Sequence, residues 1–197
     1  ISLSSDKIAE HAGAKIIDYS NYGNNGTRNF NSTSDFGRNF TDGKFSKALL
    51  FDGVNDYANI SNSVPDFGTE PYAYEFWMKT TGSSRASLLA LNPNTNFFVH
   101  HSDTGNVGKL YFAGTDYSNR NNLNNGEWRH VAASRSGTTV SVYVDGILDF
   151  TFTDSNSRTT PVSYIGSNDG TNFYFNGTID ELSIWNISLE SNTILQH

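Results

Sequence analysis

The sequence contains no cysteine, and this excludes disulfide frameworks, thiolate metal sites and cysteine nucleophiles together. It also has no run approaching the ~20 apolar residues that a membrane-spanning helix needs, so we expect no membrane insertion. The first residues lack the basic segment followed by an apolar one that marks a secretory signal. We therefore expect a soluble chain that is a mature or excised piece, and we expect it to be part of a larger multidomain protein.

Positive charge is also scarce. There are 13 Lys and Arg residues against 20 Asp and Glu, which gives a formal net charge of −7 at pH 7. No cluster of lysines or arginines offsets this excess, so a phosphate backbone or an anionic lipid surface would be repelled. We therefore expect neither nucleic acid nor an anionic membrane as a partner.

The sequence is rich in residues that form short strands and turns. Aromatic residues make up 14% of it and charged residues only 17%, with 17 glycines and abundant Asn, Ser and Thr. A length of 197 residues is sufficient for one complete core. We predict an all-β protein with a single domain that spans residues 1–197.

Residues 127–146 (EWRHVAASRSGTTVSVYVDG) show the clearest local pattern. Val131 and Ala133 alternate with polar or small residues before a Ser-Gly-Thr break, and further valines alternate after it. A period of two on both sides of a short break predicts an antiparallel hairpin with one buried face. Asp145 and Gly146 tolerate the positive φ of a tight primed turn, so residues 147–150 should fold back as a third strand.

The segment Tyr72–Lys79 is dense in aromatic residues on both alternating faces. A strand that is apolar on both faces is typical of the centre of a sheet, and this predicts a central strand. Trp77, Trp128 and Trp185 all lie in strand-like surroundings. We expect all three tryptophans to be largely buried.

Four segments, in order, resemble one family. They are residues 18–27 (DYSNYGNNGT), 50–57 (LFDGVNDY), the hairpin at 127–146 and 175–185 (FNGTIDELSIW). Together they are similar to the laminin-G-like jelly rolls of the concanavalin A-like lectin/glucanase superfamily. The resemblance covers nearly the whole chain and implies a two-sheet antiparallel β-sandwich, the concanavalin A-like jelly roll.

The resemblance also implies a structural calcium site that links the early loop to the closing strand. Its candidate ligands are Asp18, Asp52, Asp180 and Glu181, which fall within the matching segments. Carboxylate, amide and main-chain oxygens are the ligands that Ca²⁺ selects. The alternative is that Asp18 and Asp52 cap turns through local hydrogen bonds to the main chain, while Asp180 or Glu181 is simply solvated.

A catalytic function finds little support in the residues. Related jelly-roll glucanases carry an acid and a nucleophile two or more residues apart on one strand, so that both face the substrate. Here Asp180 and Glu181 are adjacent, which predicts opposite faces, and no second Glu follows at a suitable spacing. No Gly-x-Ser-x-Gly turn is present either. We expect no enzyme, with a glycoside hydrolase or lyase as the minor alternative.

Carbohydrate binding has positive support in the loops. Sugar sites need an aromatic ring for stacking and planar polar side chains for the hydroxyls, placed above a rigid sheet. Several Asn-rich turns offer this combination, although for any single residue an ordinary turn is the favoured interpretation. The candidates are Asn92, Asn96, His100, Tyr117, Arg120, Asn168, Asp169 and Tyr174.

The leading interpretation is therefore a non-catalytic recognition module of an extracellular or cell-surface protein, with a lectin-like, carbohydrate-binding function. Its partner would be a glycan or a cell-surface protein. The alternative is a protein–protein adhesion or structural module with the same fold, and the third possibility is a polysaccharide-active enzyme with an unrecognised site.

Overall fold

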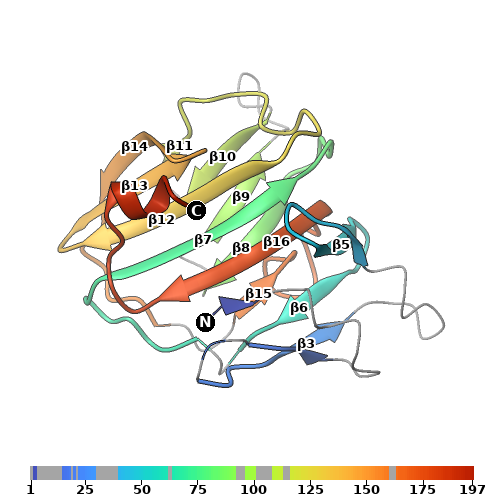
Figure 1. Cartoon of the computed structure of the whole chain (residues 1–197), viewed down its shortest axis with the longest axis horizontal. Helices are drawn as coiled ribbons and strands as arrows, with labels where there is room; N and C mark the ends of the chain where they lie inside the picture. The colour runs from blue at the N-terminus through green and yellow to red at the C-terminus, as the bar shows by residue number, and fades with distance from the viewer. Residues whose placement is uncertain are drawn as a thin grey trace.

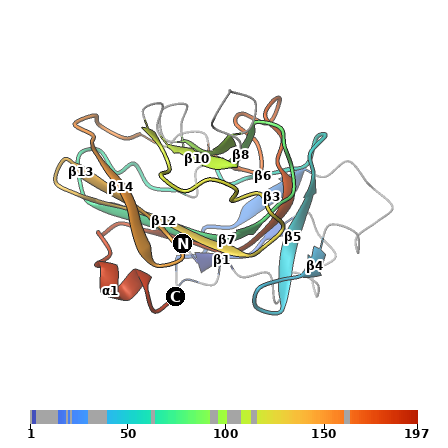
Figure 2. The ribbon, with the colours of Figure 1, turned by 90° about the horizontal axis from the view of Figure 1, so that it is seen from above.

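The computed structural model describes residues 2–3, 15–18, 20, 22–29, 40–61, 64–91, 96–100, 108–112, 116–159 and 163–197. These residues form two antiparallel sheets that stack as the two layers of a sandwich (Figure 1). Seen from above, β8 and β10 lie in one layer and β7 and β12 in the other (Figure 2). The predicted two-sheet antiparallel β-sandwich is confirmed.

The first sheet contains eight strands, with β1 beside β16 and the other seven in one row. In spatial order that row is β14 (Ile147–Thr153), β13 (Thr139–Val144), β12 (Arg129–Ser136), β7 (Tyr72–Lys79), β16 (Asn176–Trp185), β5 (Lys47–Asp52) and β4 (Phe40–Asp42). The short strand β1 (Ser2–Leu3) pairs with Leu182 and Ser183 of β16.

The second sheet also has eight strands within the described ranges. In spatial order they are β11 (Asp116–Tyr117), β10 (Lys109–Phe112), β9 (Asn96–His100), β8 (Ala86–Leu91), β15 (Ser163–Ile165), β6 (Tyr57–Asn59), β3 (Gly26–Asn29) and β2 (Lys15–Ile16). Alternate side chains of both sheets enclose one apolar core, as two stacked amphipathic sheets require.

The predicted hairpin and its primed turn are both confirmed. Val131 of β12 pairs with Val144 of β13, and Ala133 pairs with Val142, so that their side chains share the buried face. Asp145 and Gly146 have φ of 52° and 73°, and β14 folds back beside β13 as expected.

The single described helix, α1 (Ser191–Ile194), lies outside the first sheet (Figure 2). Its Ile194 packs with Ala132 and Tyr143, the side chains of β12 and β13 that point away from the core. No helix within the described ranges is long and apolar enough to cross a membrane.

The central position of β7 is confirmed, because β12 and β16 flank it on both sides. Trp77, Trp128 and Trp185, which were expected to be largely buried, are half-buried, and none of them belongs to the enclosed core. Trp77 lies on the face of β7 opposite the buried Phe76 and Met78, where no second sheet covers it. Strand periodicity separates the two faces of β7 but does not tell which of them receives the second layer.

Candidate functional site

The early loop is organised by Asp18, a buried residue that follows β2. Its Oδ1 accepts the main-chain N–H of Ser20 at 2.8 Å, and its Oδ2 accepts that of Asn24 at 2.8 Å. Oδ2 also accepts the Ser20 hydroxyl at 2.6 Å. The carboxylate thus closes its own loop, which is the turn-capping role that Asp residues commonly take.

Asp52 and Asp180 have similar local roles. Asp52 Oδ1 accepts the N–H of Val54 at 2.7 Å in the turn after β5. Asp180 is 2% exposed, and its Oδ2 accepts the N–H of Phe45 at 3.0 Å, which fastens the β4–β5 turn to β16. Its Oδ1 accepts the N–H of Glu181 at 3.0 Å.

No three His, Asp or Glu side chains come together as a metal site within the residues that the structure describes. Asp18, Asp52 and Asp180 therefore do not form a common carboxylate cluster, and each is engaged with main-chain N–H groups instead. Calcium binding stays a prediction. The carboxylates of Asp18, Asp52 and Asp180 do not come together as ligands of one ion.

The prediction that Asp180 and Glu181 point to opposite faces is wrong. The pairing of β16 with β7 shifts between Asp180 and Ser183, where Glu181 is an extra residue with φ of 48°. Asp180 pairs with Trp77 on the outer face, and Glu181 lines a hollow on that same face together with Trp77. The bulge breaks the alternation on which the prediction rested.

Polar and aromatic side chains gather on the outer face of the second sheet. Tyr57 and Asn59 of β6 flank the buried Ala58, so both point outward. Asn59 pairs with Tyr164 of β15 on one side and with Thr27 of β3 on the other. Because opposite residues of antiparallel strands share a face, these side chains form one surface.

We name this surface the tyrosine face and define it by Tyr57, Tyr164 and Tyr174 with Asn25, Asn29 and Asn59. A hollow of about 360 Å³ lies between its asparagines and Tyr57. The rings of Tyr57 and Tyr164 meet edge to face, with centroids 5.6 Å apart, and Asn29 Nδ2 donates a hydrogen bond to the Tyr57 hydroxyl. The rings are thereby held in place while remaining partly exposed.

The loop between β15 and β16 forms one wall of the tyrosine face. Gly170, at φ of 79°, approaches both rings so closely that a Cβ there would lie 3.2 Å from Tyr57 Cζ and 3.3 Å from Tyr164 Cε1. Tyr174 donates its hydroxyl to the Gly170 carbonyl at 2.8 Å. Asp169 accepts hydrogen bonds from Thr171 and Asn172 and fixes the loop tip.

The electrostatics of this face favour neutral hydrogen-bond donors. Partial burial raises the pKa of Tyr164 and of Tyr174, and the charges of Tyr57 and Asp169 raise both further. Both hydroxyls therefore stay protonated well above neutral pH. The pKa of Asp169 is lowered, because hydrogen bonds from Thr171 and Asn172 outweigh the opposing effect of burial.

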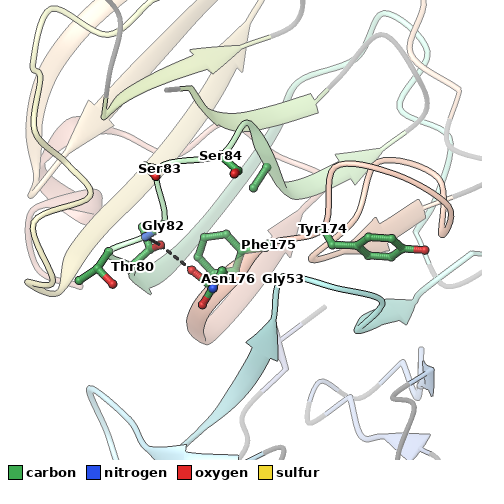
Figure 3. A pocket seen from close by; sticks show the side chains of 10 residues that line it. Gly53, Thr80, Gly82, Ser83, Ser84, Tyr174, Phe175 and Asn176 are labelled. Carbon is green, nitrogen blue, oxygen red and sulfur yellow. Dashed lines mark hydrogen bonds between the residues drawn. The ribbon is translucent and has the colours of Figure 1, made fainter. Parts of the chain in front are cut away.

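A second hollow, of about 300 Å³, lies on the other side of Tyr174. Figure 3 shows Phe175 and Asn176 facing Ser83 and Ser84, with the Tyr174 ring directed away from them. The Thr80 hydroxyl donates to the Asn176 carbonyl at 2.5 Å and accepts the Gly82 N–H at 2.9 Å. Tyr174 thus belongs to the tyrosine face and also lines this hydroxyl-rich hollow.

The structure brings together only part of the sugar-binding set that the sequence suggested. Asn168, Asp169 and Tyr174 lie in the loop beside the tyrosine face. Arg120 lies elsewhere: its Nη1 is 3.7 Å from Asp145 Oδ2 and its Nε is 3.9 Å from Asp149 Oδ1, both in the β13–β14 hairpin.

Four of the predicted residues cannot be placed as side chains. Asn92 lies outside the described residues. Asn96 and His100 belong to β9 and Tyr117 to β11, but their side chains also lie outside the described part of the structure.

The site residues predicted from the sequence did not include Tyr57, Tyr164, Asn29 and Asn59, which form the centre of the tyrosine face. One signal was present: in the stretch Tyr57-Ala58-Asn59 the small apolar residue alternates with an aromatic and an amide side chain. The period of two predicts an outward Tyr and Asn. The pairing of β6 with β3 and β15, which assembles the surface, joins segments far apart in the sequence.

Comparisons with known proteins agree with this architecture. A family model described as "Concanavalin A-like lectin/glucanases superfamily" matches residues 52–195. No curated protein sequence matches the chain.

Several solved structures share the fold. Domain 4 of an extracellular GH43 arabinanase from Geobacillus stearothermophilus, in complex with arabinotriose, superposes with a TM-score of 0.68 at 22% identity, covering 99% of this chain and 95% of that one. The binding domain of botulinum neurotoxin DC, in complex with rat synaptotagmin II, gives 0.67 at 12% identity, covering 100% of this chain and 50% of that one.

A structure that concerns the interaction of botulinum neurotoxin type C with two ganglioside molecules gives a TM-score of 0.66 at 12% identity, covering 100% of this chain and 49% of that one. The chain therefore spans about half the length of these toxin binding domains. At sequence identities of 12% and 22%, the similarity to these structures shows a shared fold alone.

Proposed function

Because the chain belongs to the concanavalin A-like lectin/glucanases superfamily, we propose that it is a non-catalytic carbohydrate-recognition module and that the tyrosine face is its glycan-binding surface. The observation that carries the proposal is the juxtaposition of partly exposed tyrosine rings with amide side chains on one rigid sheet face. Sugar rings stack on aromatic faces, while amides and hydroxyls hold their hydroxyl groups.

The preorganisation of the face supports this function. Tyr57 is held by Tyr164 and Asn29, and Gly170 leaves space for a side chain at neither ring, so the rings need little further ordering when a ligand arrives. Ordering rotamer-rich side chains costs roughly 0.5–1.5 kcal/mol each on binding, and a preformed surface avoids much of that cost.

The chemistry of the face does not favour hydrolysis. A glycosidase needs one carboxylic acid whose pKa is raised, so that it can protonate the leaving group. Asp169, the acid beside the tyrosines, has a lowered pKa and accepts several hydrogen bonds. It is suited to holding its loop rather than to donating a proton.

Two of the solved structures support a carbohydrate ligand in this fold, since one is a complex with arabinotriose and another concerns ganglioside binding. The arabinanase is described as extracellular, and the toxin domains are larger than this chain. Our proposal therefore includes an extracellular or cell-surface setting and a place within a larger multidomain protein.

A glycan array followed by calorimetry with the best ligand tests the proposal. Tyr57→Ala and Tyr164→Ala should each weaken binding by about tenfold or more, since loss of one stacked ring costs on the order of 1.4 kcal/mol. Tyr22, which is 81% exposed in the early loop, provides the matched control, and Tyr22→Ala should bind normally. Normal binding by both tyrosine-face variants, with their folds intact, would refute the assignment.

The alternative is protein recognition, and one apolar patch favours it. Ile147, Leu148 and Leu195 are 57%, 52% and 64% exposed, and Leu195 packs against the turn at Gly146. Exposed apolar clusters often mark protein contacts. Ile147→Asp should leave glycan binding unchanged if the tyrosine face is the site, whereas it should abolish association with a protein partner if this patch is the interface.

A further inference from the structure

A second hollow with binding chemistry lies on the outer face of the first sheet, and we name it the tryptophan groove. It has a volume of about 530 Å³. Its floor and walls include Glu75 and Trp77 from β7, His130 from β12 and Trp185 from β16, with His197 at the end of the described chain. The tyrosine face belongs to the other sheet, so the two sites are independent.

Glu75 is the unusual residue of the groove. It is 4% exposed, although it lies on the outer face of the central strand. His197 Nδ1 lies 2.8 Å from its Oε1, whereas Oε2 has no hydrogen-bond partner among the described residues and is 3.5 Å from His130 Nε2. A buried carboxylate oxygen without a hydrogen bond destabilises the fold, so a ligand group that donates a hydrogen bond to Oε2 would be favoured here.

Trp185 supplies the complementary group. Its indole Nε1–H is buried and lacks an acceptor among the residues that the structure describes. Buried indole N–H groups usually find a partner. Among the described residues, Glu75 Oε2 and the Trp185 indole N–H therefore each lack a hydrogen bond, with His130 Nε2 at 3.5 Å from Oε2.

The kind of ligand follows from these two groups. An ammonium group would satisfy Glu75 but not the indole, and an anion would satisfy the indole but be repelled by Glu75 and Glu181. The cation position over Trp77 is also already filled, since Lys44 Nζ lies 4.2 Å from the ring centroid. A hydroxylated ring, with hydroxyls that both donate and accept, satisfies both groups and can pack against the aromatic walls.

We propose that the tryptophan groove binds a saccharide ring whose hydroxyls donate to both carboxylate oxygens of Glu75, in place of His197 on Oε1, and accept the indole N–H of Trp185. The His197 side chain is 39% exposed and holds Glu75 from the open side of the groove. It acts as an internal competitor that occupies the carboxylate until a ligand displaces it. This site is additional to the tyrosine face and does not depend on it.

Nuclear magnetic resonance of the three tryptophan indole groups tests the proposal directly. The protein is titrated with arabinotriose, maltotriose and N-acetylated chitotriose to about 20 mM each, which detects millimolar dissociation constants. The indole signals are assigned with single Trp→Phe variants. The Trp185 signal should shift on saturation with at least one probe, while that of Trp128, which does not line the groove, should stay in place.

Two variants distinguish ligand binding from a purely structural role. Glu75→Gln should raise the dissociation constant by about tenfold or more, because it removes a charged hydrogen-bond acceptor. His197→Ala should tighten binding, because the internal competitor is gone. In the variant Tyr57→Ala the Trp185 response should persist, so a failed tyrosine face and a failed groove can be told apart.

Two results would overturn the proposal. If none of the three trisaccharides moves the Trp185 signal, the groove is not a saccharide site. If His197→Ala weakens binding, His197 belongs to the ligand-binding set and its role as a competitor is refuted.

Discussion

Replacing Asp180 with alanine should destabilise the protein substantially, and the structure allows the size of the effect to be worked out. The carboxylate is 2% exposed and accepts two main-chain N–H groups, from Phe45 and from Glu181, each at 3.0 Å. The first bond joins the β4–β5 turn to β16 across 135 residues of sequence. Alanine would leave both N–H groups without this acceptor.

Each hydrogen bond to a charged group contributes roughly 1.5–3 kcal/mol to stability. The lower value applies to each of these bonds, because they are only partly buried, and it gives a loss of about 3 kcal/mol. For a protein of this size, that loss lowers the melting temperature by roughly 6–12 °C. Asp180→Asn keeps one carbonyl acceptor and should lose about half as much.

Urea unfolding at pH 7, in chelator and again in calcium, measures the effect. Asp42→Ala is the matched control, because Asp42 lies in the same β4–β5 hairpin, where its carboxylate is exposed and contacts Lys47 at 2.6 Å. The control should unfold at the same urea concentration as the wild type.

Two results would contradict the reasoning. If Asp180→Ala unfolds like the wild type in chelator, the two N–H groups do not depend on this carboxylate. If its loss of stability appears only in calcium, Asp180 is a metal ligand rather than a turn cap.

Three further predictions concern other parts of the molecule. Gly166→Ala should lower the free energy of unfolding by about 2–5 kcal/mol, because φ is 79° and the new Cβ would clash with the Phe51 ring; a urea melt like that of the wild type would refute this. Burial raises the pKa of Glu75, but the nearby imidazoles of His130 and His197 outweigh it and hold that pKa below its usual value. The ionised carboxylate therefore stabilises the fold above about pH 4.3, the usual pKa in the unfolded chain. The difference in unfolding free energy between the wild type and Glu75→Gln should shrink as the pH falls below that value and through the lowered pKa. A difference that does not change with pH would contradict this prediction. Calcium at ~100 times its dissociation constant should raise the melting temperature by several degrees relative to the protein in chelator. Superimposable melts in calcium and in chelator would show that the protein has no stabilising calcium site.

The local parts of the structure could be predicted from the sequence. The alternation of residues 127–146 predicted β12 and β13, and Asp145 with Gly146 predicted the primed turn between β13 and β14. The turn-capping alternative for Asp18 also required only neighbouring residues, since its carboxylate accepts the N–H groups of Ser20 and Asn24, two and six positions away. Such features depend on dihedral preferences and on a period of two, both of which are properties of short segments.

The sites depended on tertiary structure. The tyrosine face exists because β6 pairs with β3 and with β15, which brings Tyr57 beside Asn29 and Tyr164. The extra residue Glu181 shifts the register of β16 and turns a second carboxylate toward the outer face. Neither follows from alternation, because strand register and the choice of the covered face are set by packing between distant segments. For the same reason the sequence could show that Trp77 and Phe76 point in opposite directions, but only the stacking of the two sheets decided that Phe76 enters the core and Trp77 lines a groove.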